Sequence, residues 1–127
     1  MRFTVFTLFV NNQDQALRFY VGRLGFTMTE DKRLGDYRWL LAAAPHSKEV
    51  GFNLELARTP EQQALVGKQG GGKPVFALGT DDCRGDYQTM KARGVTFDSE
   101  PRTMPYGTGV TLNDLYGNKI YLNEDPR

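Results

Sequence analysis

The stretch NNQDQALRFYVGRLGF, residues 11–26, decides how the chain is organised. Residues 3–10, just before it, are rich in valine, phenylalanine and threonine, which favour β-strands. Asn12 is of a type that caps helices, Gly25 is of a type that ends them, and the residues between carry an apolar stripe at spacings of three and four: Ala16, Leu17, Tyr20, Val21 and Leu24. A strand followed by a helix over residues 13–24 is therefore predicted.

The second half of the chain repeats this order. After the first helix, residues 26–30, 37–43 and 51–57 have the composition of strands. Residues 75–80 predict another strand, Asp82 caps a helix that reaches Arg93 with Cys83, Tyr87 and Met90 on one stripe, and residues 95–98, 108–113 and 119–122 are again extended. Residues 3–57 and 75–123 thus repeat one strand-helix-strand-strand-strand unit, which predicts an α+β fold.

The segment between the repeats has the composition of a linker. Thr59-Pro60-Glu61-Gln62 predicts a cap and the first turn of a short helix, and three glycines follow at residues 70–72. We therefore expect one domain in three parts: module one over residues 1–58, the linker over 59–74 and module two over 75–127.

Composition narrows the kind of partner. The 127 residues carry a formal charge of +1 with acids and bases interspersed, which argues against nucleic acid and favours a small molecule. The chain has one cysteine, no run of about 20 apolar residues and no signal-peptide pattern at its start. A cytoplasmic protein that does not enter membranes is the expectation.

These residues resemble a known superfamily. In module one the resemblance rests on Asn12, Ala16, Phe19-Tyr20 and Leu24-Gly25-Phe26. In module two it rests on Thr80-Asp81-Asp82, Tyr87, Lys91-Ala92-Arg93-Gly94-Val95, Asp114 and Gly117-Asn118. In order and spacing they are similar to the vicinal oxygen chelate superfamily, which includes glyoxalase I, the bleomycin-resistance proteins and the extradiol dioxygenases. The resemblance implies two tandem βαβββ modules that form a cup-shaped, partly open β-barrel with helices on the outside, and a homodimer.

The resemblance also implies four strand positions that hold a divalent metal in many members. In this sequence those positions are Val5, Glu55, Val75 and Tyr121. One carboxylate and one phenol are too few, because even catalytic zinc usually has about three protein ligands and hard cations need several oxygens. We therefore expect no metal ligands, no bound metal and no other cofactor.

Strand alternation predicts which side chains line the cup. If Val5 faces it, so do the residues at period two on the same and neighbouring strands. The apolar residues of the opposite parity then lie on the helix-covered face, where the core is expected: Phe6, Leu8, Val10, Leu54, Leu56, Phe76, Leu78, Ile120 and Leu122. With aromatic residues near the rim added, the predicted ligand-binding residues are Val5, Thr7, Phe9, Trp39, Asn53, Glu55, Val75, Ala77, Tyr106, Tyr121 and Asn123. A mainly apolar wall with a few polar groups is typical of small-molecule sites.

Glu55 and Tyr121 are the candidate catalytic residues. Burial would raise the pKa of the Glu55 carboxyl toward values useful for a general acid or base, but Glu55 could equally be held by a neighbouring asparagine, tyrosine or arginine in a relic site. Tyr121 could orient a ligand or act with Glu55, or could serve packing alone. Trp39 could likewise belong to the core or to a dimer interface.

Two classes of function follow. The first is a bleomycin-resistance-like protein that binds a small, largely apolar or amphipathic molecule in a metal-free cup, for resistance or sequestration. The alternative is an enzyme, a metal-independent lyase or isomerase that uses Glu55 as general acid or base. A metal-dependent glyoxalase or dioxygenase is disfavoured, since both need the metal that these positions do not provide. A third hypothesis is a homodimer whose cup no longer has a function.

Overall fold

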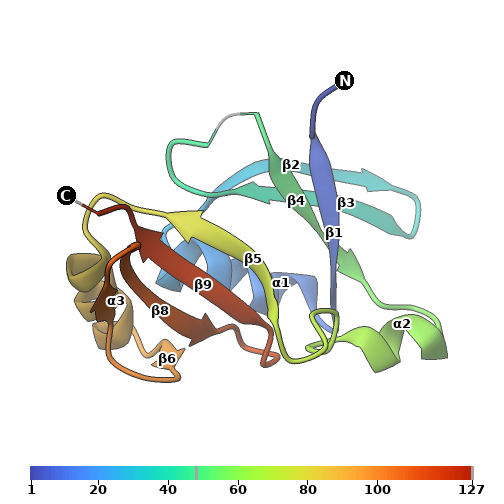
Figure 1. Cartoon of the computed structure of the whole chain (residues 1–127). Helices are drawn as coiled ribbons and strands as arrows, with labels where there is room; N and C mark the ends of the chain where they lie inside the picture. The colour runs from blue at the N-terminus through green and yellow to red at the C-terminus, as the bar shows by residue number, and fades with distance from the viewer. Residues whose placement is uncertain (48, 127) are drawn as a thin grey trace. The chain divides into compact units, whose positions relative to one another are not determined.

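The computed structural model describes residues 1–47 and 49–126. The chain divides into two compact units, residues 1–67 and 68–127. Each unit contains its own β-sheet with helix packed on one face (Figure 1). The predicted α+β fold class is confirmed.

The first unit has a four-stranded sheet in the order β1-β4-β3-β2, with β1 parallel to β4 and the other pairs antiparallel. Its elements along the chain are β1 (Val5–Val10), α1 (Gln13–Leu17), η1 (Arg18–Arg23), β2 (Thr27–Leu34), β3 (Tyr37–Ala43), β4 (Gly51–Leu56) and α2 (Pro60–Leu65).

The second unit repeats this topology with one addition. Its sheet has the order β5-β9-β8-β6, and β7 also pairs with β8. Its elements are β5 (Pro74–Gly79), α3 (Cys83–Ala92), β6 (Thr96–Phe97), β7 (Arg102–Met104), β8 (Gly107–Asn113) and β9 (Lys119–Glu124). The sequence predicted three strands after α3 and missed β7, which has only three residues, all of them exposed. In the first unit one long strand, β2, occupies the corresponding edge.

The first helix differs from its prediction in its second half. Residues 13–17 are α-helical, but residues 18–23 form a π-helix in which the Leu24 N–H donates to the Phe19 carbonyl, 3.1 Å away. The wider turn rotates the stripe, so that Phe19 is buried whereas Val21 is 37% exposed. The predicted position of Val21 on the apolar stripe is therefore wrong.

Apolar side chains at every second position of the strands fill the core between helix and sheet in each unit. Leu8, Val10 and Leu54 are buried in the first unit, as Ile120 and Leu122 are in the second. In the first unit an aromatic cluster joins the helix to the sheet, because the Tyr20 ring meets those of Phe26 and Phe52 with centroids 5.6 and 5.0 Å apart. The predicted helix-covered face of β1 and β4 is thus present.

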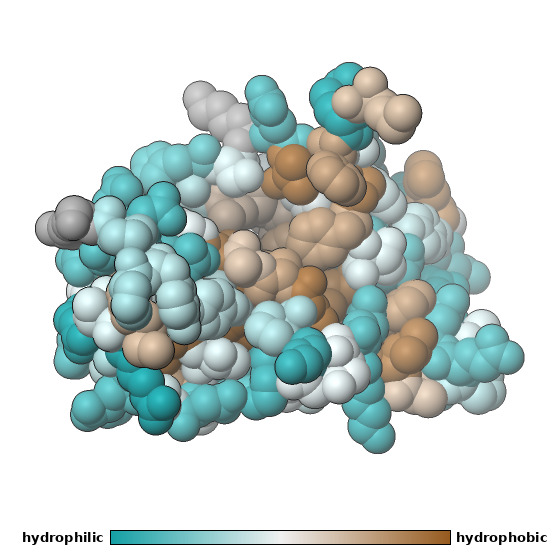
Figure 2. All heavy atoms as spheres, in the orientation of Figure 1, coloured by the Kyte–Doolittle hydropathy of each residue, from teal (hydrophilic) through white to brown (hydrophobic). Residues whose placement is uncertain are grey.

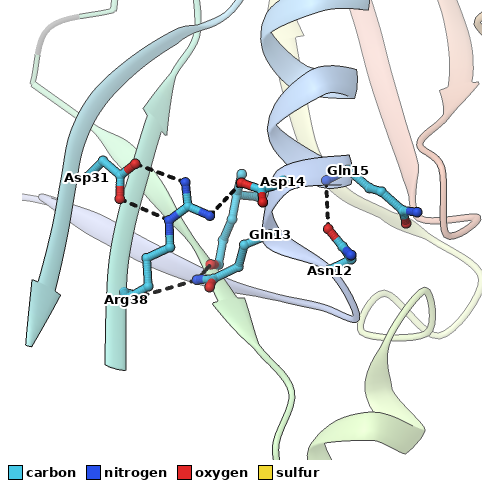
Figure 3. Close-up of polar contacts among 7 residues, drawn as sticks. Asn12, Gln13, Asp14, Gln15, Asp31 and Arg38 are labelled. Atoms are coloured by element: carbon cyan, nitrogen blue, oxygen red, sulfur yellow. Dashed lines mark hydrogen bonds and ion pairs between the residues drawn. The ribbon is translucent and has the colours of Figure 1, made fainter. Parts of the chain in front are cut away.

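Polar contacts fix α1 to the same face of the first sheet (Figure 3). The buried Gln13 amide donates to the backbone carbonyls of Leu54 at 2.8 Å and Arg38 at 3.1 Å. The Arg38 guanidinium donates two hydrogen bonds to Asp31 and one to Asp14, which raises the Arg38 pKa above its usual range and lowers the pKa of both carboxyls. These hydrogen bonds link α1 to β2, β3 and β4 on the helix-covered face of the sheet, so they anchor the helix there.

Apolar side chains remain exposed at the start of β1, an edge strand of the first sheet. Phe3 is 86% exposed, and Val5 and Phe6 are 39% and 38% exposed. Figure 2 shows hydrophobic side chains at the surface in the region of β1. Phe6 was expected to be buried, and it stacks on Phe52 with ring centroids 5.4 Å apart, but it remains partly exposed.

No helix in the described part of the chain is long and apolar enough to span a membrane.

Candidate ligand-binding site

The face of the first sheet opposite its helix brings together six of the predicted site residues. Because β1 and β4 run in parallel register, Thr7 lies beside Asn53 and Phe9 beside Glu55. Strand alternation adds Val5 on β1 and Trp39 on β3 to the same face. We call this the open face of the first sheet. Its β1 residues are apolar apart from Thr7, and its other polar groups lie on β3 and β4.

Glu55 is the polar centre of this open face. Its Oε2 accepts a hydrogen bond from the Tyr37 hydroxyl at 2.8 Å and a second from the Asn53 amide Nδ2 at 3.1 Å. Asn53 is buried and Glu55 is half-buried. No hydrogen bond in the described part of the chain engages the other oxygen, Oε1. The cluster therefore holds one carboxylate oxygen in place and leaves the second able to accept a hydrogen bond from a bound molecule.

Tyr37 acts as a donor in this cluster. Burial raises the pKa of its hydroxyl, and the hydrogen bond to Glu55 and the charge of that carboxylate raise it further, while Arg58 opposes the shift. The hydroxyl accordingly stays protonated near neutral pH and keeps its bond to Glu55. Tyr37 is not among the site residues predicted from the sequence. Its parity with Trp39 was the signal that it shares the open face.

Trp39 is held by its ring nitrogen. The Nε1–H donates to Glu30 Oε2 at 2.6 Å, and the Lys32 ammonium lies 3.8 Å from the other Glu30 oxygen. Trp39 is half-buried. With its polar edge directed at β2, its ring is fixed on the open face, which suits a flat apolar wall.

The remaining predicted residues lie in the second unit. On the corresponding open face of its sheet, Ala77 of β5 and Thr111 of β8 flank Tyr121 of β9, and Asn123 follows Tyr121 at period two. Val75 precedes Ala77 on β5, but the register shifts between Pro74 and Phe76, so the period of two does not extend to Val75. Tyr106 is not in this face: it lies in the turn between β7 and β8 and is 71% exposed.

The donor set at the four family metal positions does not fit a metal. Val5 and Val75 have no donor atom, Tyr121 offers a phenol, and Glu55 has one oxygen already engaged by two hydrogen bonds. Among residues 1–47 and 49–126, no group of three or more histidine, cysteine, aspartate or glutamate side chains is arranged to hold a metal ion. The four positions together thus offer one carboxylate and one phenol as donor groups.

The sequence and the fold were compared with known proteins. The family model described as the Glyoxalase/Bleomycin resistance protein/Dioxygenase superfamily matches residues 2–122. The chain belongs to this superfamily. The resemblance found in the sequence is therefore confirmed.

Several relatives are similar over nearly their whole length. An uncharacterized protein from Shewanella frigidimarina is 40% identical over 113 residues, which are 87% of this chain and 84% of that protein. The crystal structure of UcmS2 superposes with a TM-score of 0.86 at 31% identity and covers 97% of both chains. TnmS3, an antibiotic binding protein from Streptomyces sp. CB03234, gives a TM-score of 0.82 at 28% identity over 99% of this chain and 97% of its own.

We expect the purified protein to carry less than about 0.1 equivalents of zinc, iron, nickel or manganese, because structural and catalytic sites need about three or more protein ligands. Elemental analysis by mass spectrometry after gel filtration measures this directly. Incubation with EDTA should leave the melting temperature unchanged. A stoichiometric metal that survives gel filtration would contradict this prediction and reopen the metal-dependent activities.

Proposed function

We propose that this protein binds a small, largely apolar or amphipathic molecule without a metal, in a role of resistance or sequestration. The observation that carries the proposal is the Glu55 cluster: a half-buried carboxylate, held by Tyr37 and Asn53, on a face whose neighbouring side chains include Phe9 and Trp39. One polar group among apolar neighbours fixes the orientation of a ligand while burial supplies the affinity. The antibiotic binding by TnmS3, a relative of the same fold, supports this class of function.

The free Glu55 oxygen sets the polarity of the ligand group that it would meet. Glu55 Oε1 can only accept when the carboxylate is ionised, so the ligand must present an N–H or O–H donor there. A hydrogen bond to a charged acceptor contributes about 1.5–3 kcal/mol, which is roughly a tenfold to hundredfold change in affinity. In this proposal the protein is a cytoplasmic homodimer that uses neither nucleic acid nor membrane.

A thermal-shift screen of metabolites and antibiotics tests the proposal, because a ligand that binds the folded state raises the melting temperature. Glu55→Gln is expected to weaken binding of each hit by about tenfold or more. The glutamine oxygen would satisfy Tyr37 and Asn53, so its NH₂ group would take the place of Oε1 and present a donor where the ligand needs an acceptor. Titration calorimetry on both proteins measures the change.

Glu100→Gln is the matched control, since Glu100 is exposed and lies outside every helix and strand. It should bind each hit as the wild type does. If no compound shifts the melting temperature, or if Glu55→Gln binds hits as tightly as wild type, the proposed role of the Glu55 cluster is wrong.

The alternative is a metal-independent lyase or isomerase, and one observation favours it. The Tyr37 hydroxyl, a proton donor, lies 2.8 Å from a carboxylate that could act as general base through its other oxygen. Mass spectrometry of each hit after incubation with the protein separates the two functions. A new product that disappears with Glu55→Gln indicates catalysis, whereas unchanged ligand at full occupancy indicates binding alone.

A further inference from the structure

Tyr121 lies across a glycine of the neighbouring strand. In the β8–β9 ladder Thr111 pairs with Tyr121, and Gly109 pairs with Asn123, so Gly109 is the diagonal neighbour of Tyr121. A methyl group at Gly109 would lie 2.5 Å from Cζ and 3.0 Å from Cε1 of Tyr121, and closer still to its hydroxyl oxygen. The tip of the phenol therefore occupies the space that any other residue at position 109 would fill.

The backbone does not explain why position 109 is glycine. Gly107, two residues earlier, has a φ of 130°, which favours glycine, but Gly109 is not among the residues with positive φ. A methyl at Gly79, on β5 of the same sheet, would meet nothing within 4 Å. The requirement at Gly109 is thus one of space, and the group that uses the space is Tyr121.

The Tyr121 hydroxyl has no hydrogen-bond partner in the described part of the chain. Tyr121 is half-buried on the open face of the second sheet, beside Ala77. A tyrosine that served packing alone would gain nothing from holding a hydroxyl at a fixed point on a partly covered face. The hydroxyl can donate to an acceptor on a bound molecule.

We propose that Gly109 is a positioning residue, which lets Tyr121 lie flat so that its hydroxyl donates a hydrogen bond to an acceptor oxygen of the ligand. This inference rests on the proposed binding function, deepens it, and concerns the open face of the second sheet alone. A molecule bound on that face presents an oxygen acceptor, such as a carbonyl, carboxylate or sulfonate, to the Tyr121 hydroxyl. Gly109→Ala should displace the phenol and remove this contact without altering the fold.

The first arm of the test needs no ligand. In the wild type, a strong nuclear Overhauser effect is expected between the α-protons of Gly109 and the ring ε-protons of Tyr121. Gly109→Ala should shift the Tyr121 ring resonances, whereas Gly79→Ala, which adds a methyl to the same sheet in open space, should leave them in place. Absence of the Overhauser effect in the wild type overturns the inference.

The second arm uses 1-anilinonaphthalene-8-sulfonate, an amphipathic fluorescent probe with acceptor oxygens. Tyr121→Phe should raise its dissociation constant about tenfold, the change expected when a hydrogen bond to a charged group is lost. Gly109→Ala should raise it to a similar extent in the wild-type background and by less than about twofold in the Tyr121→Phe background, because both changes remove the same contact. Melting curves confirm that each variant folds.

The outcomes separate this inference from the proposed function. If the probe binds the wild type and Tyr121→Phe binds equally well, the ligand contact is wrong although binding stands. If Gly109→Ala weakens binding fully in the Tyr121→Phe background, Gly109 does not act through the hydroxyl and its positioning role is overturned. If the probe does not bind the wild type, the proposed function fails for this chemistry, and the ligand contact fails with it.

Discussion

Asp114→Ala is expected to lower the free energy of unfolding by about 3 kcal/mol, from the loss of hydrogen bonds to a buried charged acceptor. Asp114 is 6% exposed, and its Oδ1 accepts from the backbone N–H groups of Tyr116 at 2.8 Å and Asn118 at 2.9 Å. Its Oδ2 accepts from the Asn118 side-chain amide at 2.9 Å. Alanine would leave these donors without their acceptor, and Asn118 is buried too deeply for water to replace it, being 1% exposed.

Loss of these hydrogen bonds should also affect Tyr121, because the turn leads directly into β9. The turn closes with the Gly117 N–H donating to the Asp114 carbonyl at 3.1 Å, and β9 then carries Tyr121. Asp114→Ala should therefore also broaden the Tyr121 ring resonances. Urea unfolding followed by circular dichroism measures the stability change.

Asp114→Asn is the matched variant. It keeps one acceptor oxygen and replaces the other with an amide that faces the Asn118 amide, so it should lose less stability than alanine. Asp125→Ala, at an exposed residue beyond β9, should stay within about 0.5 kcal/mol of the wild type. A loss below about 1 kcal/mol for Asp114→Ala would show that the turn is held by its backbone alone.

The sequence predicted the parts of the fold that depend on local pattern. Alternation along β1 and β4 placed Leu8 and Leu54 on the buried face and Glu55 on the open face, because side-chain direction in a strand is fixed by parity. The two predicted capping residues are also confirmed. The side chains of Asn12 and Asp82 accept hydrogen bonds from backbone N–H groups in the first turns of α1 and α3.

The contacts across strands were harder to predict, since they depend on register. Nothing local to Glu55 identifies Tyr37 as its partner; the two meet because β3 and β4 are antiparallel in one particular register. The space at Gly109 that receives Tyr121 has the same origin. These pairings position the candidate residues on each sheet, so their contacts could not be derived from composition or periodicity.

The first helix shows a different limit. A 3.6-residue period predicts Val21 on the apolar stripe, but the π-helix adds a residue to the turn and brings Phe19 into the core instead. The difference arises from packing: the Phe19 and Tyr20 rings meet edge to face with centroids 5.2 Å apart, and Tyr20 meets Phe52 of the sheet. Tertiary contacts here override the period of the isolated helix.

Phe19→Ala should therefore destabilise the protein strongly, by about 3 kcal/mol or more, because it removes a ring that is 5% exposed and leaves a cavity beside Tyr20. Val21→Ala should lose less than about 1 kcal/mol, since a side chain that is 37% exposed buries little area. If residues 18–23 formed a regular α-helix with the predicted stripe, Val21→Ala would be the more destabilising of the two substitutions. Urea unfolding of the two variants at one pH separates the alternatives.

Arg18→Ala, at an exposed position in the same π-helix, is the control for helix propensity, because alanine favours helices at least as well as arginine. It should change the unfolding free energy by less than about 0.5 kcal/mol. If Val21→Ala proved more destabilising than Phe19→Ala, residues 18–23 would form a regular α-helix in solution. The Tyr20 ring would then need another packing against the sheet, and the covered face of β4 would change with it.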